Sequence, residues 1–197
     1  AVFVFPRYLP VRRSGLPLWY TQGFNPHLYM TFALPIALGF EGLCESMDLR
    51  LTEEMPYPDI VARLNAALPP DLRATAAAAP VHKPERIAWA DYAVTLRCDD
   101  PAAVRGELAA FLDQPEIQVE KKTKKGMKSV DIKPLTKAIS TGEADGALHL
   151  ALRSAAGIHT NISPTLLLTA FFARRGGELP VHIIRERILC DDLTLFC

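Results

Sequence analysis

The chain has 197 residues, enough for one large domain or two small ones. Hydrophobic residues make up 49% of it, charged residues 22%, and the formal net charge is zero, which argues against non-specific nucleic-acid binding by the whole surface. No apolar run reaches the roughly 18 residues that a membrane span needs, and no signal peptide is visible. We therefore expect a cytoplasmic protein with no membrane contact.

The cysteines give no sign of metal or redox chemistry. They are Cys44, Cys98, Cys190 and Cys197, and none forms a C-x-x-C pair or stands near a histidine at metal-ligand spacing. A C-x-x-x-C-x-x-C cluster is also absent from the sequence. We expect buried structural thiols, with no metal and no cofactor.

The first 84 residues predict mostly strands. Strand composition occurs at 1–5, 29–34, 46–51 and 72–81, and apolar residues at helical spacing predict a helix over 58–68 that ends at Pro69-Pro70.

Residues 12–15, Arg-Arg-Ser-Gly, resemble the last turn of a helix with its glycine cap. The chain upstream is too short to hold the body of that helix. We therefore expect residues to be missing from the sequence next to Val11-Arg12.

The remaining residues predict two helices among strands. Asp100-Pro101 and Ser163-Pro164 are start signals for helices over 101–112 and 164–175, and Gly176-Gly177 ends the second. Strands are predicted at 92–97, 117–122, 129–132, 147–152 and 182–189.

Both halves approximate the order β-α-β-β-α-β of the ferredoxin-like unit. The sequence therefore predicts an α+β fold of two tandem ferredoxin-like units with mostly antiparallel sheets. The first would cover residues 1–84, without its first helix, and the second residues 85–197, with a lysine-rich hairpin.

The most informative stretch is Tyr20-Thr21-Gln22-Gly23-Phe24-Asn25-Pro26-His27. Gly23 can adopt positive φ, and Pro26 keeps Asn25 extended, so we expect a tight loop that presents Gln22, Asn25 and His27 together. Such a loop can bind a ligand. It can equally be a turn whose polar side chains bond to their own backbone.

Residues 14–27, from Ser14-Gly15-Leu16-Pro17 to Asn25-Pro26-His27, resemble a G-L-P-x-x-Y-[ST]-Q-G-F-N-P-H motif. Two further segments follow in order, Phe32-Ala33-Leu34-Pro35-Ile36-Ala37-Leu38-Gly39 and Glu45-Ser46-Met47-Asp48-Leu49-Arg50-Leu51. Together they are similar to the radical-SAM-linked family, a bacterial domain of unknown function. The chain departs from the family at Leu28-Tyr29, where members usually carry Pro-Lys, so one expected cation is lost.

This resemblance implies a partner domain in a bacterial radical-SAM system and leaves its activity open. A radical-SAM protein is the partner that it implies, and RNA, as tRNA or rRNA, is the ligand that we regard as most plausible. The tandem pattern is also similar to that of CRISPR repeat-processing ribonucleases, at the level of fold alone.

The segment 121–128 carries five lysines in eight residues: Lys121, Lys122, Lys124, Lys125 and Lys128. A hairpin with these lysines near its tip could contact phosphates, or it could be a solvated edge kept soluble by its charge.

If RNA binds, Tyr20, Phe24 and Tyr29 could offer stacking faces, and Gln22, Asn25 and His27 could contact base edges beside Gly23.

Three functions stay open. The first is a non-catalytic recognition or adaptor module that binds RNA and works with a radical-SAM protein. The second is a metal-independent RNA-processing enzyme with His27 as general acid/base. The third is a protein-interaction module that docks on the radical-SAM partner through a sheet edge and binds no RNA.

Overall fold

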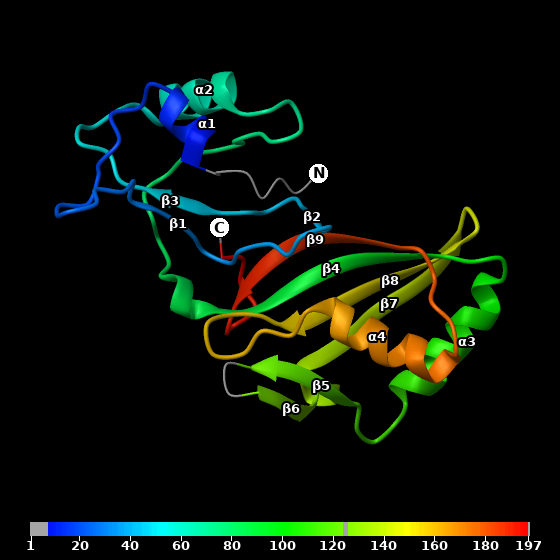
Figure 1. The fold of residues 1–197 in the computed structure, drawn as a ribbon. Coiled ribbons are helices and arrows are strands. Elements are labelled where there is room, and N and C mark those ends of the chain that lie inside the picture. The colour runs from blue at the N-terminus through cyan, green and yellow to red at the C-terminus, as the bar shows by residue number, and fades with distance from the viewer. Residues whose placement is uncertain (1–7, 124–125, 197) are drawn as a thin grey trace. The chain divides into compact units, whose positions relative to one another are not determined.

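A computed structural model describes residues 8–123 and 126–196 (Figure 1). The chain divides into two compact units. The first holds the described residues up to Gly39 together with Glu45–Lys83, and the second holds Phe40–Cys44 and the residues from Pro84 onward. The expected α+β class with mostly antiparallel sheets is confirmed.

The first unit contains two helices and a two-stranded sheet. Its elements are α1 (Tyr8–Arg13), β1 (Met30–Phe32), β3 (Met47–Leu49) and α2 (Tyr57–Ala67). β1 and β3 are antiparallel, and isolated antiparallel bridges at Leu18↔Leu51 and Tyr20↔Leu28 join residues 18–20 to the chain beside these two strands.

One apolar cluster holds the first unit together. Its buried members are Val11, Leu16, Leu28, Met30 and Leu64. They come from both helices, β1 and the segments beside it, so the amphipathic face of α2 packs on the strands. Burial of each side chain of this size contributes about 1.5–3 kcal/mol.

The second unit is larger. Its elements are β2 (Glu41–Gly42), the 3-10 helix η1 (Pro84–Arg86), β4 (Ile87–Arg97), α3 (Pro101–Leu112), β5 (Gln118–Thr123), β6 (Gly126–Asp131), the 3-10 helix η2 (Lys133–Leu135), β7 (Thr136–Ala144), β8 (Ala147–Ala155), α4 (Pro164–Arg175) and β9 (Val181–Cys190).

Five of these strands form one sheet in the order β2-β9-β4-β8-β7, and β5 and β6 form a separate hairpin. β9, β4, β8 and β7 are antiparallel to their neighbours, whereas β2 is parallel to β9. Without β2 and the hairpin, the elements run β4-α3-β7-β8-α4-β9.

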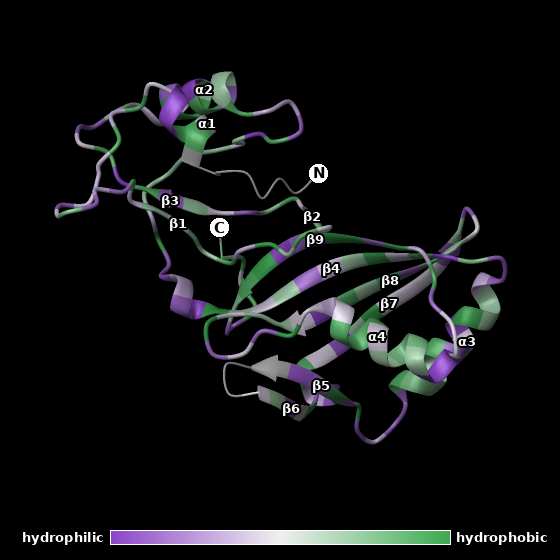
Figure 2. Ribbon diagram, viewed as in Figure 1, coloured by the Kyte–Doolittle hydropathy of each residue, from purple (hydrophilic) through white to green (hydrophobic). Residues whose placement is uncertain are grey.

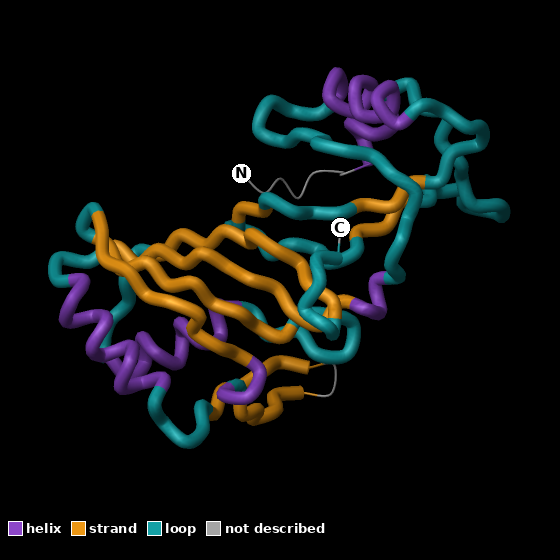
Figure 3. The backbone as a smooth tube through the Cα atoms, turned by 180° about the vertical axis from the view of Figure 1, so that it is seen from behind, coloured by secondary structure: helices purple, strands orange, loops and turns teal. Residues whose placement is uncertain are grey.

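Both helices of the second unit lie on one face of this sheet (Figures 1 and 3). Leu96 of β4 and Leu150 of β8 are buried, as are Phe111 and Phe171 on the helices, whose ring centroids are 5.6 Å apart. Figure 2 shows apolar residues along α4 and along the strands of the sheet. Among the described residues of this unit, the other face of the sheet carries no helix.

Local signals explain the ends of α3 and α4. The Asp100 side chain accepts a hydrogen bond from the Ala103 amide, and Ser163 accepts one from Thr165. Gly176 ends α4 with φ of 82°, a conformation that favours glycine. The predicted helices over 101–112 and 164–175 are confirmed, and the one over 58–68 begins and ends one residue earlier.

The strand predicted over 72–81 is wrong. This segment is described throughout and contains no strand, because the Asn65 side chain takes the place of a strand partner: its amide donates to the Ala74 carbonyl at 2.9 Å and its oxygen accepts from the Ala74 amide at 2.8 Å. The run is also rich in alanine, which has little preference for strands. The described part of the first unit therefore lacks one element of the expected β-α-β-β-α-β order.

Other expectations for the first unit have mixed outcomes. The strand expected over 1–5 lies outside the described residues. The helical turn expected before Gly15 is present as the end of α1, and Gly15 follows with φ of +68°. Arg63 of α2 donates to the Gly15 carbonyl at 2.7 Å and holds this end in place. That residues are missing next to Val11-Arg12 stays a prediction.

Candidate functional site

The motif around Tyr20 forms a hairpin-like loop in the first unit. Tyr20 and Leu28 form an antiparallel bridge at its base, and the Thr21 amide donates to the His27 carbonyl at 2.9 Å. Gly23 has φ of +133°, where a side chain would strain the backbone. The tight loop predicted from Gly23 and Pro26 is therefore present between Thr21 and His27.

His27 is held in one orientation by its own loop. Its Nδ1 lies 3.1 Å from the Thr21 hydroxyl and 3.1 Å from the Asn25 carbonyl oxygen, and its backbone amide donates to the Thr21 hydroxyl at 3.0 Å. These contacts leave Nε2 without a hydrogen-bond partner among the residues that the structure describes. No described carboxylate or lysine is bonded to the ring either.

Three side chains of the loop project into solvent. Phe24 is 103% exposed, so nothing in the described structure covers its ring. Gln22 and Asn25 are also exposed, and neither side-chain amide has a hydrogen-bond partner among the described residues. The interpretation of a turn that satisfies its own polar side chains therefore fits Thr21 and His27, but not these two amides.

An aromatic and cationic cluster lies beside the loop. The Arg50 guanidinium carbon is 4.5 Å from the centroid of the Trp19 ring, and Tyr29 meets Trp19 edge-on with centroids 5.8 Å apart. Backbone hydrogen bonds hold the three residues together. The Trp19 amide donates to the Arg50 carbonyl at 2.8 Å, and the Tyr29 amide donates to the Trp19 carbonyl at 3.1 Å. We call Trp19, Tyr29 and Arg50 the stacking cluster.

The stacking cluster faces away from the core of its unit. Side chains alternate between the two faces of a strand, and the neighbours of the cluster pack on the buried apolar core: Leu18, Leu28, Met30, Leu49 and Leu51. Tyr29 is 44% exposed, and Arg50 is exposed without an ion pair to any described residue. The cluster can therefore meet a planar ligand from solvent.

Tyr20 is placed differently from the other predicted aromatics. It packs against the apolar core and is only partly exposed. The Arg12 guanidinium carbon covers its ring at 5.6 Å from the centroid. Of the three predicted stacking residues, Phe24 and Tyr29 are presented to solvent and Tyr20 stabilises the base of the loop.

Trp19 and Arg50 were not among the predicted site residues. A signal for Arg50 was available, because the alternation of Met47, Leu49 and Leu51 places residue 50 on the solvent face. Trp19 lies within the motif itself, directly before Tyr20, but the sequence does not show that its ring meets Arg50.

The lysine hairpin belongs to the second unit and is partly described. Lys121 and Lys128 are directly opposite each other on β5 and β6, and Lys121 donates to the Asn161 carbonyl at 2.6 Å. Lys128 is exposed. Lys124 and Lys125 lie outside the described residues, as does the side chain of Lys122. Lys121 therefore has a structural role in tying the hairpin to the loop before α4.

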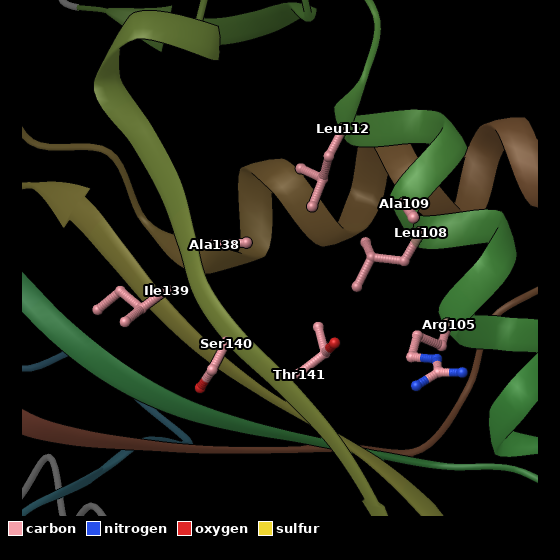
Figure 4. A pocket seen from close by; sticks show the side chains of 8 residues that line it. All are labelled: Arg105, Leu108, Ala109, Leu112, Ala138, Ile139, Ser140 and Thr141. Carbon is pink, nitrogen blue, oxygen red and sulfur yellow. The ribbon is translucent and has the colours of Figure 1, made fainter.

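Two hollows lie apart from these features. One, of about 260 Å³, is formed by α3 and β7 and is lined mainly by apolar side chains, with Arg105 at its edge (Figure 4). Arg105 is already paired with Glu143 at 3.0 Å. The other, of about 530 Å³ in the first unit, is lined by Glu53, Glu54 and apolar residues, and its charge would repel an anion.

Within residues 8–123 and 126–196, no group of three histidine, cysteine, aspartate or glutamate side chains could hold a metal ion. In the same residues, no helix is long and apolar enough to cross a bilayer.

Comparison with known proteins identifies a family for the chain. A family model described as "Uncharacterized protein conserved in bacteria (DUF2344)" matches residues 4–164. The comparison with curated proteins finds no match, and neither does the comparison with solved structures. The matched segment includes the loop and the stacking cluster.

Proposed function

The chain belongs to the family of uncharacterized proteins conserved in bacteria, DUF2344, and we propose that its first unit is a non-catalytic module that recognises single-stranded RNA. Residues 19–29 and Arg50 would form the binding surface. The observation that carries the proposal is the stacking cluster at the base of the loop that presents the fully exposed Phe24.

The aromatic rings account for affinity. Single-stranded RNA is recognised chiefly by stacking its splayed bases on aromatic rings and arginine planes. Trp19 with Arg50 over its ring, Tyr29 and the solvated Phe24 offer such surfaces. Alanine substitution at a stacking residue costs about 1–3 kcal/mol per base.

The loop amides account for selectivity. The side-chain amides of Gln22 and Asn25 each have hydrogen-bond donors and an acceptor, and none of these groups is hydrogen-bonded to a described residue. They can read the Watson–Crick edges of unpaired bases, which are inaccessible in a duplex. The module should therefore prefer loops and single strands to double-stranded RNA.

The partner in this proposal is a radical-SAM protein. The support is the resemblance of residues 14–27, 32–39 and 45–51 to the motifs of the radical-SAM-linked family. The module would present RNA to the partner, since the chain itself carries no cluster of cysteines for radical chemistry.

We also assign the second unit to the ferredoxin-like class. Its element order is β4-α3-β7-β8-α4-β9, and the corresponding strands lie in the order β9-β4-β8-β7. β2 and the β5–β6 hairpin are then additions to that unit.

The test measures binding of a labelled single-stranded RNA of random sequence to the full chain. Phe24→Ala and Trp19→Ala should each lower affinity about tenfold. Tyr57→Ala is the matched control, because Tyr57 is an exposed aromatic of the same unit that lines the acidic hollow. Equal losses in all three variants would show that neither the stacking cluster nor Phe24 has a special role in binding.

The same samples separate recognition from catalysis. A recognition module leaves the RNA intact, and His27→Ala then lowers affinity only. Shortened RNA that disappears with His27→Ala would instead establish the RNA-processing function. If the unmodified chain fails to bind RNA at low salt, the proposal is wrong and docking on a protein partner remains.

A further inference from the structure

The sheet of the second unit has one face that its helices leave open (Figure 3). Val94 and Leu96 of β4 are buried on the side of α3 and α4, so Ala93 and Thr95 lie on the opposite side. Ala93 and Thr95 are both partly exposed. The same alternation places Asp91 on this open face.

A row of charged side chains crosses the open face. Asp91 is directly opposite Arg187 on β9 and Arg153 on β8, and Arg153 is directly opposite Lys137 on β7. Residues directly opposite each other in a sheet share a face. Arg187, Asp91, Arg153 and Lys137 therefore form a line across four strands with three cations and one acid.

Asp91 organises this row. Its carboxylate is only 2% exposed, and Arg153 binds it through Nε at 2.6 Å and Nη2 at 2.9 Å. Arg187 reaches the same carboxylate through Nη2 at 3.0 Å. A buried carboxylate that is paired in this way fixes both guanidinium groups in place before any ligand arrives.

The outer members of the row remain available to a ligand. The Arg187 side chain is 53% exposed, and its contact with Asp91 uses one of its nitrogens. Lys137 is exposed and makes no hydrogen bond or ion pair with any residue that the structure describes. One acid against three cations leaves a net positive charge.

Small side chains beside the charged row let a ligand approach the sheet closely. Ala93 is directly opposite Ala151, which in turn is opposite Ser140. These small side chains keep the face low over β4, β8 and β7, while Ile184 of β9 lies opposite Ala93 on the other side. His149 and Thr95, whose side chains are 3.2 Å apart, lie on the far side of this floor.

We propose that this open face binds the phosphate backbone of an extended RNA strand, with Arg187 and Lys137 as the contacts and Asp91 and Arg153 as the pair that positions them. The proposal rests on the RNA-binding function proposed above. The row crosses three inter-strand spacings of about 4.8 Å each, too long for one phosphate but suited to successive phosphates of one strand. Contacts of this kind fix position and carry no sequence information.

The experiment uses the full chain, a labelled single-stranded RNA of random sequence and a range of salt concentrations. The variant Arg187→Ala/Lys137→Ala removes the two proposed phosphate-binding side chains. Its matched control, Arg105→Ala/Arg174→Ala, removes the same charge from exposed positions on α3 and α4, on the covered side of the sheet. Thermal unfolding verifies that both variants stay folded.

We expect the affinity of Arg187→Ala/Lys137→Ala to fall about tenfold at low salt and the control to change little. The slope of log K against log salt should become shallower by about 1.4, because each phosphate of a single strand that the protein neutralises adds about 0.7 to that slope. The decrease in affinity should be the same for purine-rich and pyrimidine-rich RNA.

Two outcomes would overturn the inference separately from the proposed function. If both double variants lose affinity equally while Phe24→Ala still weakens binding, the open face does not bind RNA and the loop still does. If the unmodified chain binds no RNA at low salt, both proposals are wrong.

Discussion

At the scale of single residues, the pairing of Arg50 with Trp19 explains why an arginine stands directly after β3. Its guanidinium carbon is 4.5 Å from the ring centroid, and a planar guanidinium can lie against the ring while its edges remain free for a base or phosphate. Arg50→Lys keeps the charge and removes the planar group. We expect RNA affinity to fall about two- to fivefold, equivalent to about 0.5–1 kcal/mol, in a titration at constant salt.

Arg12→Lys is the control for that substitution. Arg12 also covers an aromatic ring, that of Tyr20, but Tyr20 packs on the apolar core. The control should shift the unfolding midpoint slightly and leave RNA affinity unchanged. A loss of affinity as large as that of Arg50→Lys would mean that both arginines act only through their charge.

At the scale of elements, two glycines on helices should respond oppositely to alanine. Gly176 ends α4 with φ of 82°, where a side chain is strained, so Gly176→Ala should destabilise the protein by about 1 kcal/mol. Gly106 lies inside α3, and a Cβ added there would meet no atom within 4 Å, so Gly106→Ala should stabilise the protein by about 0.5–1 kcal/mol. Urea unfolding followed by circular dichroism measures both, and shifts of the same sign would contradict the assignment of the α4 cap.

These helix ends could be predicted from the sequence because their signals are local. Asp100-Pro101, Ser163-Pro164 and Gly176 act within one turn of the residues that they cap. The failure at residues 72–81 has the opposite cause, since the bond partner of Ala74 is the side chain of Asn65 in the preceding helix. A hydrogen bond of that kind leaves no trace in composition.

The same distinction applies to the candidate site. The Gln22–His27 loop could be predicted from one octapeptide, because Gly23 and Pro26 dictate its turn. The stacking of Arg50 on Trp19 depends on the pairing of two segments far apart in the chain. The row from Arg187 to Lys137 depends on the register of four strands, which composition and residue spacing along the chain do not reveal.

At the scale of the whole molecule, each unit has its own apolar core and its own tryptophan. Trp19 belongs to the first unit, and Trp89 lies in β4 of the second. The chain has two tryptophans. The fluorescence of a Trp89→Phe variant therefore reports on the first unit alone, and that of a Trp19→Phe variant reports on the second unit alone. Among its described residues the first unit buries one small apolar cluster, so we expect it to unfold at lower denaturant than the second.

Core substitutions should then act on one reporter at a time. Leu64 is 6% exposed within the first cluster, and Leu64→Ala should cost about 2–5 kcal/mol and lower the midpoint seen by Trp19 alone. Phe171 is 2% exposed and packs on Phe111, so Phe171→Ala should cost about 3–5 kcal/mol and lower the midpoint seen by Trp89. If either substitution moves both midpoints by the same amount, the chain unfolds as one cooperative body, and the loop and the open sheet face cannot be treated as surfaces of separately stable units.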